Sequence, residues 1–223
     1  MTSFYARCSD LSREILSALA LGIDLPSPAL LLSGHTGLNN QLRLLHYPPL
    51  AAALLEEDKV TRIPGHSDWS SVTLLFQDDC GGLEVEHSQR PGCFVPVPPV
   101  RDALVLNIGD LLMRWSNDVL RSTVHRVGLP PGEDRYSGAE RTVRGRYSIP
   151  FFVAPDPDTV VECLESCVGE NGVRKYGSIT QREYGRMRAM AHYEEKPQQK
   201  GEEKEIEGMG EVTKPRSILE SDW

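Results

Sequence analysis

The sequence predicts a mainly β fold, a β-sandwich or jelly roll with a helix at each end. From about residue 41 onward, short apolar runs of four to eight residues follow one another. Turn-forming pairs separate these runs: Gly81-Gly82, Pro91-Gly92, Gly109-Asp110 and Pro131-Gly132. Stretches with helical spacing of apolar residues flank the region on both sides. Many short strands joined by such turns are typical of two-sheet β folds.

The first element is a helix expected from about residue 9 to residue 25. Its apolar side chains recur at helical spacing: Leu11, Ile15, Leu16, Leu19 and Ile23. Ser9 or Asp10 can cap its start, and Pro26 ends it because proline cannot continue a helix.

Eight strands follow. They are expected at residues 42–47, around His66 and Asp68, and at 72–77, 82–86, 94–97, 103–108, 122–127 and 146–153. A closing helix is expected over residues 180–193. Beyond it the composition becomes charged and poor in apolar residues, so little there can offset the entropy of ordering. We therefore expect one jelly-roll domain over residues 1–193, with N-terminal and closing helices, and a charged, disordered tail over residues 194–223.

Composition and charge argue against some partners and cellular locations. The 223 residues carry a net charge of -8, which argues against nucleic acid because phosphate binding needs a basic surface. No apolar run approaches the roughly 20 residues that span a bilayer, and the first ten residues lack the apolar stretch of a secretory signal. The five cysteines form no CxxC pair, so we expect reduced thiols in a cytoplasmic protein. Nothing in the sequence indicates an oligomeric state.

Two histidines and one aspartate point to a reaction class. His66 and Asp68 are two residues apart, and on a strand that spacing puts both side chains on one face. His125 lies in a second strand-like run. Two imidazoles and one carboxylate are the ligand set of a non-haem Fe(II) site that leaves positions open for a cosubstrate and O₂. The tripeptide alone is common by chance, and a single buried histidine is more often a core residue than a ligand.

A second pair suits a carboxylate ligand. Arg146 and Ser148 share one face of a strand, and a guanidinium beside a hydroxyl can hold a carboxylate through charge-assisted hydrogen bonds. The alternative is a surface arginine on an edge strand. A rival copy, Arg135-Tyr136-Ser137, is followed by a loop-like sequence. We prefer the later copy because residues 149–153 can form a buried strand.

Aromatic and basic residues are candidates for the walls of a pocket. Alternation puts Arg43 and Tyr47 on one face of their strand, so the Tyr47 hydroxyl can reach a bound carboxylate and Arg43 can reach a substrate. A core tyrosine with its hydroxyl at the rim explains Tyr47 equally well. Further candidates for the wall are Trp69 and Phe151, together with Phe76 and Phe152, and each is as readily explained as part of the core.

The order of the motifs resembles a known family. LRLLHYP, GHSDWSSVTLLFQD, GGLEVE, ALVLNIGDLLMRWSN, RSTVHRV and RYSIPFF follow one another within roughly residues 1–193. This order is similar to that of the 2-oxoglutarate- and Fe(II)-dependent dioxygenases, in the branch that contains isopenicillin N synthase and the plant flavonoid oxygenases. The resemblance implies a double-stranded β-helix whose mouth holds Fe(II), with 2-oxoglutarate as cosubstrate and O₂ as oxidant.

The resemblance also implies roles for particular residues. The metal ligands of the family match His66, Asp68 and His125. The pair that grips the distal carboxylate of 2-oxoglutarate matches Arg146 and Ser148, and a tyrosine that helps to hold the cosubstrate matches Tyr47. The implied activity is the hydroxylation, desaturation or cyclisation of a small organic molecule, with a role in secondary metabolism.

Two departures and three alternatives accompany this hypothesis. Relatives usually carry a further segment before the first helix, so we expect a fragment, an alternative gene model or a reduced form. Leu45 stands where many relatives have asparagine. The first alternative is a 2-oxoglutarate-independent oxidase of the isopenicillin N synthase type, in which Arg146 and Ser148 hold a substrate carboxylate. The second is a catalytically silent jelly-roll binding protein. The third is a zinc hydrolase that uses the same three ligands.

Overall fold

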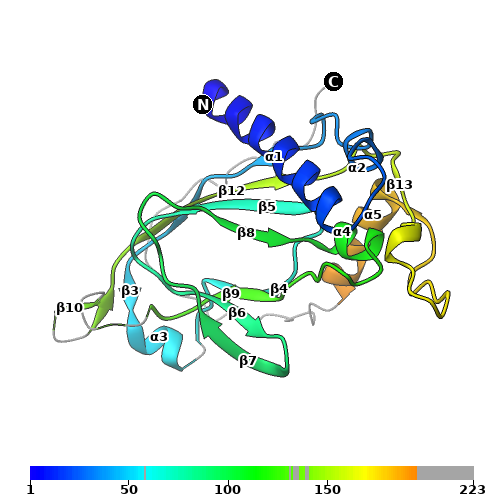
Figure 1. Cartoon of the computed structure of the whole chain (residues 1–223). Coiled ribbons are helices and arrows are strands. Elements are labelled where there is room, and N and C mark those ends of the chain that lie inside the picture. Colours follow the sequence, from blue (N-terminus) through cyan, green and yellow to red (C-terminus); the bar gives the residue numbers. More distant parts are fainter. Residues whose placement is uncertain (58, 131, 133–135, 139–140, 195–223) are drawn as a thin grey trace.

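Two antiparallel sheets face each other in the computed structural model, which describes residues 1–57, 59–130, 132, 136–138 and 141–194 (Figure 1). The larger sheet has the order β1–β12–β5–β8, and β2 also pairs with β12. Its strands are β1 (Gln41–Leu42), β2 (Leu45–Tyr47), β5 (Val72–Gln77), β8 (Val105–Ile108) and β12 (Arg146–Val153). The smaller sheet consists of β4 (Ile63–His66), β9 (His125–Val127), β6 (Leu83–His87) and β7 (Arg90–Pro96), in that order. Together the sheets form the jelly roll that the sequence predicts.

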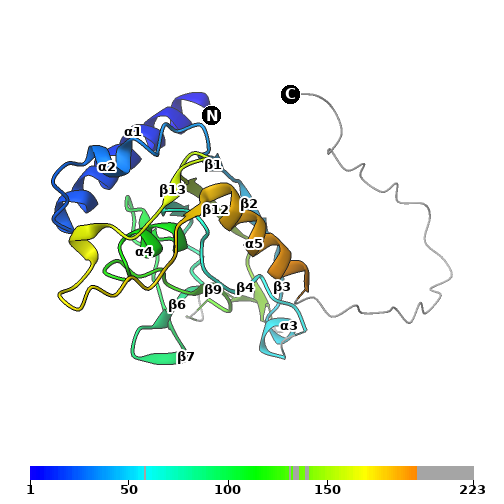
Figure 2. The same ribbon diagram turned by 90° about the vertical axis from the view of Figure 1, so that its right-hand side faces the viewer.

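Shorter elements precede, connect or follow the strands of the two sheets. They are α2 (Ala29–Leu32), β3 (Leu50–Ala51), α3 (Ala52–Glu56), α4 (Asp110–Trp115), β10 (Tyr136–Ser137), β11 (Thr142–Val143), β13 (Val160–Val161), the 3-10 helix η2 (Glu165–Cys167) and β14 (Ile179–Thr180). The closing helix α5 spans Gln181–Glu194, close to the range expected from the sequence. In Figure 2, α5 crosses one end of the barrel. The tail expected over residues 194–223 lies almost entirely outside the described residues.

The first helix, α1 (Thr2–Gly22), covers the outer face of the larger sheet (Figure 1). It begins earlier than the expected residue 9 because its apolar stripe continues toward the N-terminus. The ring of Phe4 packs edge-on against Phe76 of β5, and Tyr5 packs edge-on against Phe151 of β12. Edge-to-face aromatic pairs of this kind add to the stabilisation from burial. The first turns of α1 are therefore held by the sheet.

The larger sheet presents two different faces, because successive side chains of a strand point to opposite sides. On β5, Val72 and Leu74 are fully buried in the core under α1, whereas Thr73 faces the barrel interior. On β12, Phe151 belongs to the core under α1, and Arg146 faces the interior. A smaller apolar cluster fills part of the interior and includes Tyr47, Leu83 and Val127. The pairing of β5 with β12 keeps the two faces in register.

Several expected strands have different limits in the structure. The run at 42–47 is broken into β1 and β2, and the run at 122–127 forms a strand only over His125–Val127. β4 ends at His66, so Asp68 lies beyond the strand rather than on the same strand face as His66. The expectation that both side chains project from one strand is therefore wrong, and other contacts orient Asp68.

The helices and the cysteines can be compared with the expectations from composition. No helix in the described part of the chain is long and apolar enough to cross a membrane. All five cysteines are unpaired, and only Cys93 is exposed.

Candidate metal centre and barrel pocket

The two candidate histidines face each other across paired strands. His66, the last residue of β4, is the register partner of His125, the first residue of β9. One ligand atom from each histidine and from Asp68 lies within 4.8 Å of the others. A carboxylate oxygen of Asp68 is 3.9 Å from Nε2 of His66 and 3.8 Å from Nε2 of His125. Metal–ligand bonds of about 2.0–2.2 Å can bridge separations of up to about 4 Å, so each of these two histidine–aspartate separations is within reach of a single ion.

Backbone carbonyls orient both imidazole rings. Nδ1 of His66 lies 2.9 Å from the carbonyl oxygen of Pro64, and Nδ1 of His125 lies 3.1 Å from that of Thr123. An Nδ1–H that donates to a carbonyl leaves the Nε2 lone pair for a metal, which is the usual arrangement of metal-binding histidines. Burial lowers the pKa of His66, and the neighbouring His125 adds to this effect. The neutral form, the one that binds metals, is therefore favoured.

Two neutral side chains hold Asp68, which is 5% exposed. Its Oδ2 accepts hydrogen bonds from the Thr73 hydroxyl at 2.6 Å and from the Asn107 amide at 2.7 Å. Thr73 and Asn107 are register partners on the adjacent strands β5 and β8. Oδ1 is left facing the two histidines. Both residues were missed in the sequence, where the only available signal was a threonine in an inward-facing position of β5.

The loop that follows the candidate ligands is docked against the start of α4. The amide of Asp110 donates to the carbonyl of Asp68 at 2.7 Å, and that of Gly109 donates to the carbonyl of Ser71 at 2.8 Å. A Cβ atom at position 109 would lie 2.1 Å from the Ser70 carbonyl oxygen. The close approach therefore requires glycine, and it fixes the backbone that carries Asp68.

The carboxylate clamp expected from the sequence lies inside the barrel. Arg146 and Ser148 are 1% and 3% exposed, and Nη1 of Arg146 donates to the Ser148 hydroxyl at 3.1 Å. The guanidinium also donates to the Gln77 side-chain oxygen at 2.9 Å and to the Gly81 carbonyl at 3.1 Å, and it lies 5.1 Å from the centre of the Tyr47 ring. These partners are all neutral. Burial lowers the pKa of Arg146, and a buried cation with neutral partners is costly unless an anion joins it.

The rival copy of the clamp lies elsewhere. Tyr136 and Ser137 form β10, which belongs to a separate three-stranded sheet with β11 and β3. Arg135 lies outside the described residues. The structure thus brings Arg146 and Ser148 into the barrel, on the sheet opposite the two histidines.

A pocket of about 650 Å³ opens above the candidate metal ligands His66 and Asp68. Arg43 and Trp69 line it. Phe151 does not: it is fully buried in the outer core, and Phe152 lines the pocket in its place. Side chains alternate between the two faces of β12, so Phe152 points to the same side as Arg146 and Ser148, and Phe151 points to the other.

Helix α5 supplies one wall of this pocket, which the sequence did not predict. Gln181, Gly185, Arg188 and Ala191 face it. The helix is anchored by the buried Asp110 carboxylate, which accepts hydrogen bonds from the hydroxyls of Tyr184 and Ser67. Ser67 lies between the candidate ligands His66 and Asp68 in the chain, so α5 is tied directly to the loop that carries them.

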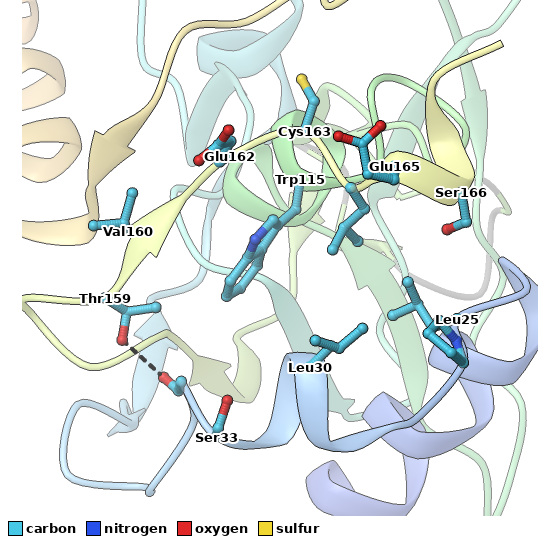
Figure 3. Close-up of a pocket in the computed structure, with 13 residues that line it drawn as sticks. Leu25, Leu30, Ser33, Trp115, Thr159, Val160, Glu162, Cys163, Glu165 and Ser166 are labelled. Atoms are coloured by element: carbon cyan, nitrogen blue, oxygen red, sulfur yellow. Dashed lines mark hydrogen bonds between the residues drawn. The ribbon is translucent and has the colours of Figure 1, made fainter. Parts of the chain in front are cut away.

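A second cavity, of about 690 Å³, lies outside the barrel between the end of α1, α2 and the β13–η2 segment (Figure 3). Trp115 stands at its centre, with Leu25 and Leu30 on one side and Glu162 and Glu165 on the other. None of the candidate site residues proposed from the sequence lines it. Among the described residues, His66, Asp68 and His125 form the one group of three histidine, cysteine or carboxylate side chains that lie close enough together to hold a metal ion.

Comparisons with known proteins agree with this geometry. Residues 38–155 match the 2OG-Fe(II) oxygenase superfamily. A 2-oxoglutarate-dependent dioxygenase of Aspergillus rugulosus is 40% identical over 195 residues, which cover 86% of this chain and 58% of that protein. A full-length Neurospora crassa protein, solved in complex with alpha-KG (2-oxoglutarate) and thymine, superposes with a TM-score of 0.76 at 36% identity. That match covers 86% of this chain and 56% of the Neurospora crassa chain.

The chain thus spans somewhat more than half the length of the relatives it matches. The family match over residues 38–155 includes the strands of both sheets. The predicted fold class, a mainly β double-stranded β-helix with flanking helices, is confirmed. The resemblance noted from the order of motifs is confirmed as well: the chain belongs to the 2OG-Fe(II) oxygenase superfamily.

Proposed function

We propose that this chain forms the iron- and cosubstrate-binding barrel of an Fe(II)- and 2-oxoglutarate-dependent oxygenase that oxidises a small organic molecule. One observation carries the proposal. The two histidines of the smaller sheet, with the aspartate that follows β4, face the same interior as a buried arginine with neutral partners on the larger sheet. A metal and a dicarboxylate need this combination, whereas a metal alone would not require the buried arginine.

In this proposal His66, Asp68 and His125 hold Fe(II), and their donor set of two imidazoles and one carboxylate suits that ion. When bound, Fe(II) with 2-oxoglutarate and O₂ supplies the oxidising chemistry, in which 2-oxoglutarate becomes succinate and CO₂ while the substrate is oxidised. The protein holds the three metal-binding side chains in place. Thr73 and Asn107 fix the aspartate, and the backbone carbonyls fix both imidazoles.

The clamp supplies the binding energy for the distal carboxylate of the cosubstrate. Arg146 and Ser148 present N–H and O–H donors from adjacent inward positions of β12. The Tyr47 ring lies against the Arg146 guanidinium, and its hydroxyl is a further donor on the same side of the barrel. Since these groups are almost fully buried, their hydrogen bonds to a carboxylate form in a region of low dielectric and are strengthened by it.

The pocket above the metal ligands favours a small substrate with an anionic group. Arg43 and Arg188 line it from different elements, and Asp68, a proposed metal ligand, is the one carboxylate among the described lining residues. Arg188 lies 3.8 Å from the Asp110 carboxylate, which offsets part of its charge, and the lining still contrasts with the net charge of -8 for the whole chain. Trp69 and Phe152 add apolar surface. A small ring with a carboxylate or another polar edge fits such a wall.

Names of relatives are consistent with that class of substrate. A protein named proline hydroxylase from Petromyces alliaceus is 39% identical over 197 residues, and the Neurospora crassa protein was crystallised with thymine. Both molecules are small polar rings, so L-proline and thymine are the first substrates to test. The cytoplasmic location expected from the sequence is part of the proposal, and the five unpaired thiols support it.

The decisive test is an anaerobic titration of the purified protein with Fe(II) and 2-oxoglutarate, followed through the metal-to-ligand charge-transfer absorption. We expect the band to form with the wild-type chain and to be lost in His125→Ala. The loss of Fe(II) affinity should exceed the roughly 100-fold that removing a hydrogen-bond partner of a ligand costs. A wild-type protein without the band would contradict the proposal.

Product analysis separates the alternatives. Release of succinate on exposure to O₂ supports the 2-oxoglutarate-dependent reaction, while substrate oxidation without succinate indicates an oxidase of the isopenicillin N synthase type. A protein that binds no Fe(II), and in which His125→Ala changes nothing, is a silent binding protein. Hydrolysis supported by zinc, with no charge-transfer band, would indicate the hydrolase.

A further inference from the structure

A second guanidinium lies at the inner end of the barrel, beside the clamp. Arg62 immediately precedes β4, and its Nη2 donates to the carbonyl of Arg144 at 2.9 Å. Arg144 is two residues before Arg146 in the chain. The guanidinium carbon of Arg62 is also 5.9 Å from the centre of the Tyr47 ring, and that of Arg146 is 5.1 Å from the same centre. Two cations from opposite sheets therefore contact one tyrosine.

The hydrogen-bonding capacity of Arg62 is largely unused. Its Nε and Nη1 atoms are buried and have no hydrogen-bond partner, and among the described residues no other side chain has two such nitrogens. The amide nitrogen of Gln77, whose oxygen accepts from Arg146, is also buried without a partner. Buried donors are nearly always paired, and leaving one unpaired is costly. Three unused donors in one neighbourhood indicate an acceptor that binds there.

The protein's own acids near the clamp are engaged elsewhere. The two carboxylate oxygens of Asp78 accept from the backbone amides of Cys80 and Tyr147. Asp79 forms an ion pair with Arg144. Burial is the main cause that lowers the pKa of Arg146, and repulsion from the positive charge of Arg62 adds to it. Two partly or fully buried like charges that lie near the same ring are stabilised by an anion that contacts both.

We propose that Arg62 is a second cationic residue for the distal carboxylate of 2-oxoglutarate, which it contacts through Nε and Nη1 while Arg146 and Ser148 contact it from the facing sheet. This inference rests on the proposed function. Strand β4 then carries a cosubstrate-binding side chain just before its first residue and a metal ligand, His66, at its last. A single strand would set the separation between the two ends of the cosubstrate.

A purely structural role is the competing explanation, because the hydrogen bond to Arg144 ties β4 to the segment before β12. The two roles differ in what they predict for matched ligands. 2-Oxoglutarate and 2-oxovalerate have the same keto-acid end and the same number of carbons, but 2-oxovalerate ends in a methyl group. Only 2-oxoglutarate carries the carboxylate that Arg62 would bind.

The experiment compares dissociation constants of both keto acids for Fe(II)-loaded protein under anaerobic conditions, by charge-transfer absorption. Three variants are measured beside the wild type: Arg62→Met, Arg62→Lys and the exposed control Arg101→Met. Hydrogen bonds to charged groups are worth enough that Arg62→Met should weaken 2-oxoglutarate by about 10- to 100-fold. Its affinity for 2-oxovalerate should change by less than about threefold, because that ligand makes no use of the guanidinium. Arg62→Lys should recover part of the loss, and Arg101→Met should match the wild type.

Each other outcome overturns the inference. Equal weakening of both keto acids by Arg62→Met would assign Arg62 a structural role through Arg144. Unchanged binding of both would place its guanidinium outside the cosubstrate site, and the proposed function would stand. Absence of 2-oxoglutarate binding to the wild type would instead remove the proposed function and this inference together. Circular dichroism and thermal unfolding show whether Arg62→Met folds, and if it does not, Arg62→Lys decides by the ratio of the two dissociation constants.

Discussion

The two faces of the larger sheet carry different kinds of side chain from the same strands. Toward α1, the side chains of β5 and β12 are apolar and fully buried, as at Leu74 and Phe151. Toward the barrel interior, the intervening positions are polar, as at Thr73, Arg146 and Ser148. Because alternation alone separates the faces, one strand contributes to the stability of the fold and to the candidate site at adjacent residues. The outer face needs close packing, and the inner face needs donors at set positions.

This difference predicts that adjacent substitutions act on different properties. The outer face resembles an ordinary protein core, in which removed atoms leave a cavity. The inner face carries buried hydrogen-bonding groups, so a substitution there removes a donor from the candidate site. Stability should report on the outer face and ligand affinity on the inner one.

The largest expected effect comes from the adjacent pair Phe151 and Phe152. Phe151→Ala should lower the free energy of unfolding by about 3–5 kcal/mol, since a fully buried phenylalanine is replaced by a cavity. Phe152→Ala should cost about 1 kcal/mol or less, because its ring lines the mouth pocket. Denaturant unfolding measures both values. Equal losses of stability would show that the two faces are not energetically distinct.

A change on the inner face should weaken the candidate metal site. Thr73→Val removes the hydroxyl that donates to Asp68 at 2.6 Å while keeping the side-chain shape. Loss of such a partner typically lowers metal affinity by about 10- to 100-fold. Fe(II) binding, measured by anaerobic competition with a chelator, tests this expectation. Thr73→Ser keeps the hydroxyl and should bind Fe(II) as the wild type does, whereas equal affinity of all three proteins would contradict the role given to Thr73.

Sequence reasoning found the strands best where a run of apolar residues was bounded by clear turns. β5 and β12 have the predicted limits, Val72–Gln77 and Arg146–Val153. The three candidate metal ligands and the clamp were chosen by residue type and order, and the fold brings each set together. The choice of Phe151 for the pocket wall was wrong. Alternation from Arg146 and Ser148 along the same strand already predicts that Phe152, and not Phe151, faces inward.

Residues that act through tertiary contacts were not accessible to the same reasoning. Asn107 reaches Asp68 only because β5 and β8 pair in one particular register. Arg188 lines the pocket because α5 folds back over the barrel end. Arg62 adjoins the clamp because β4 and β12, which are far apart in sequence, belong to sheets that face each other. None of these residues has a spacing signature, since their partners lie on other elements.

The smallest effect expected is a pH dependence of stability that belongs to the outer face. His35 is 3% exposed; its ring nitrogens lie 2.7 Å from the Leu31 carbonyl and 2.8 Å from the Ser71 hydroxyl. Burial lowers the pKa of His35, so the folded chain keeps it neutral at a pH where the unfolded chain binds a proton. The contribution of His35 to the free energy of unfolding is therefore complete above about pH 6.5. It declines as the pH falls toward the folded-state pKa, by at most about 1.4 kcal/mol per pH unit.

His35→Gln tests this expectation, because the amide can keep one donor and one acceptor without titrating. The free energy of unfolding of the wild type should fall more steeply than that of the variant as the pH is lowered from 6.5. We expect no such difference in the pH dependence of Fe(II) binding. Ser71 connects the two regions, because its carbonyl accepts a hydrogen bond from Gly109 and its hydroxyl contacts His35. If His35→Gln also shifted the pH dependence of Fe(II) binding, the two faces would be coupled through that serine, and treating them as independent would be wrong.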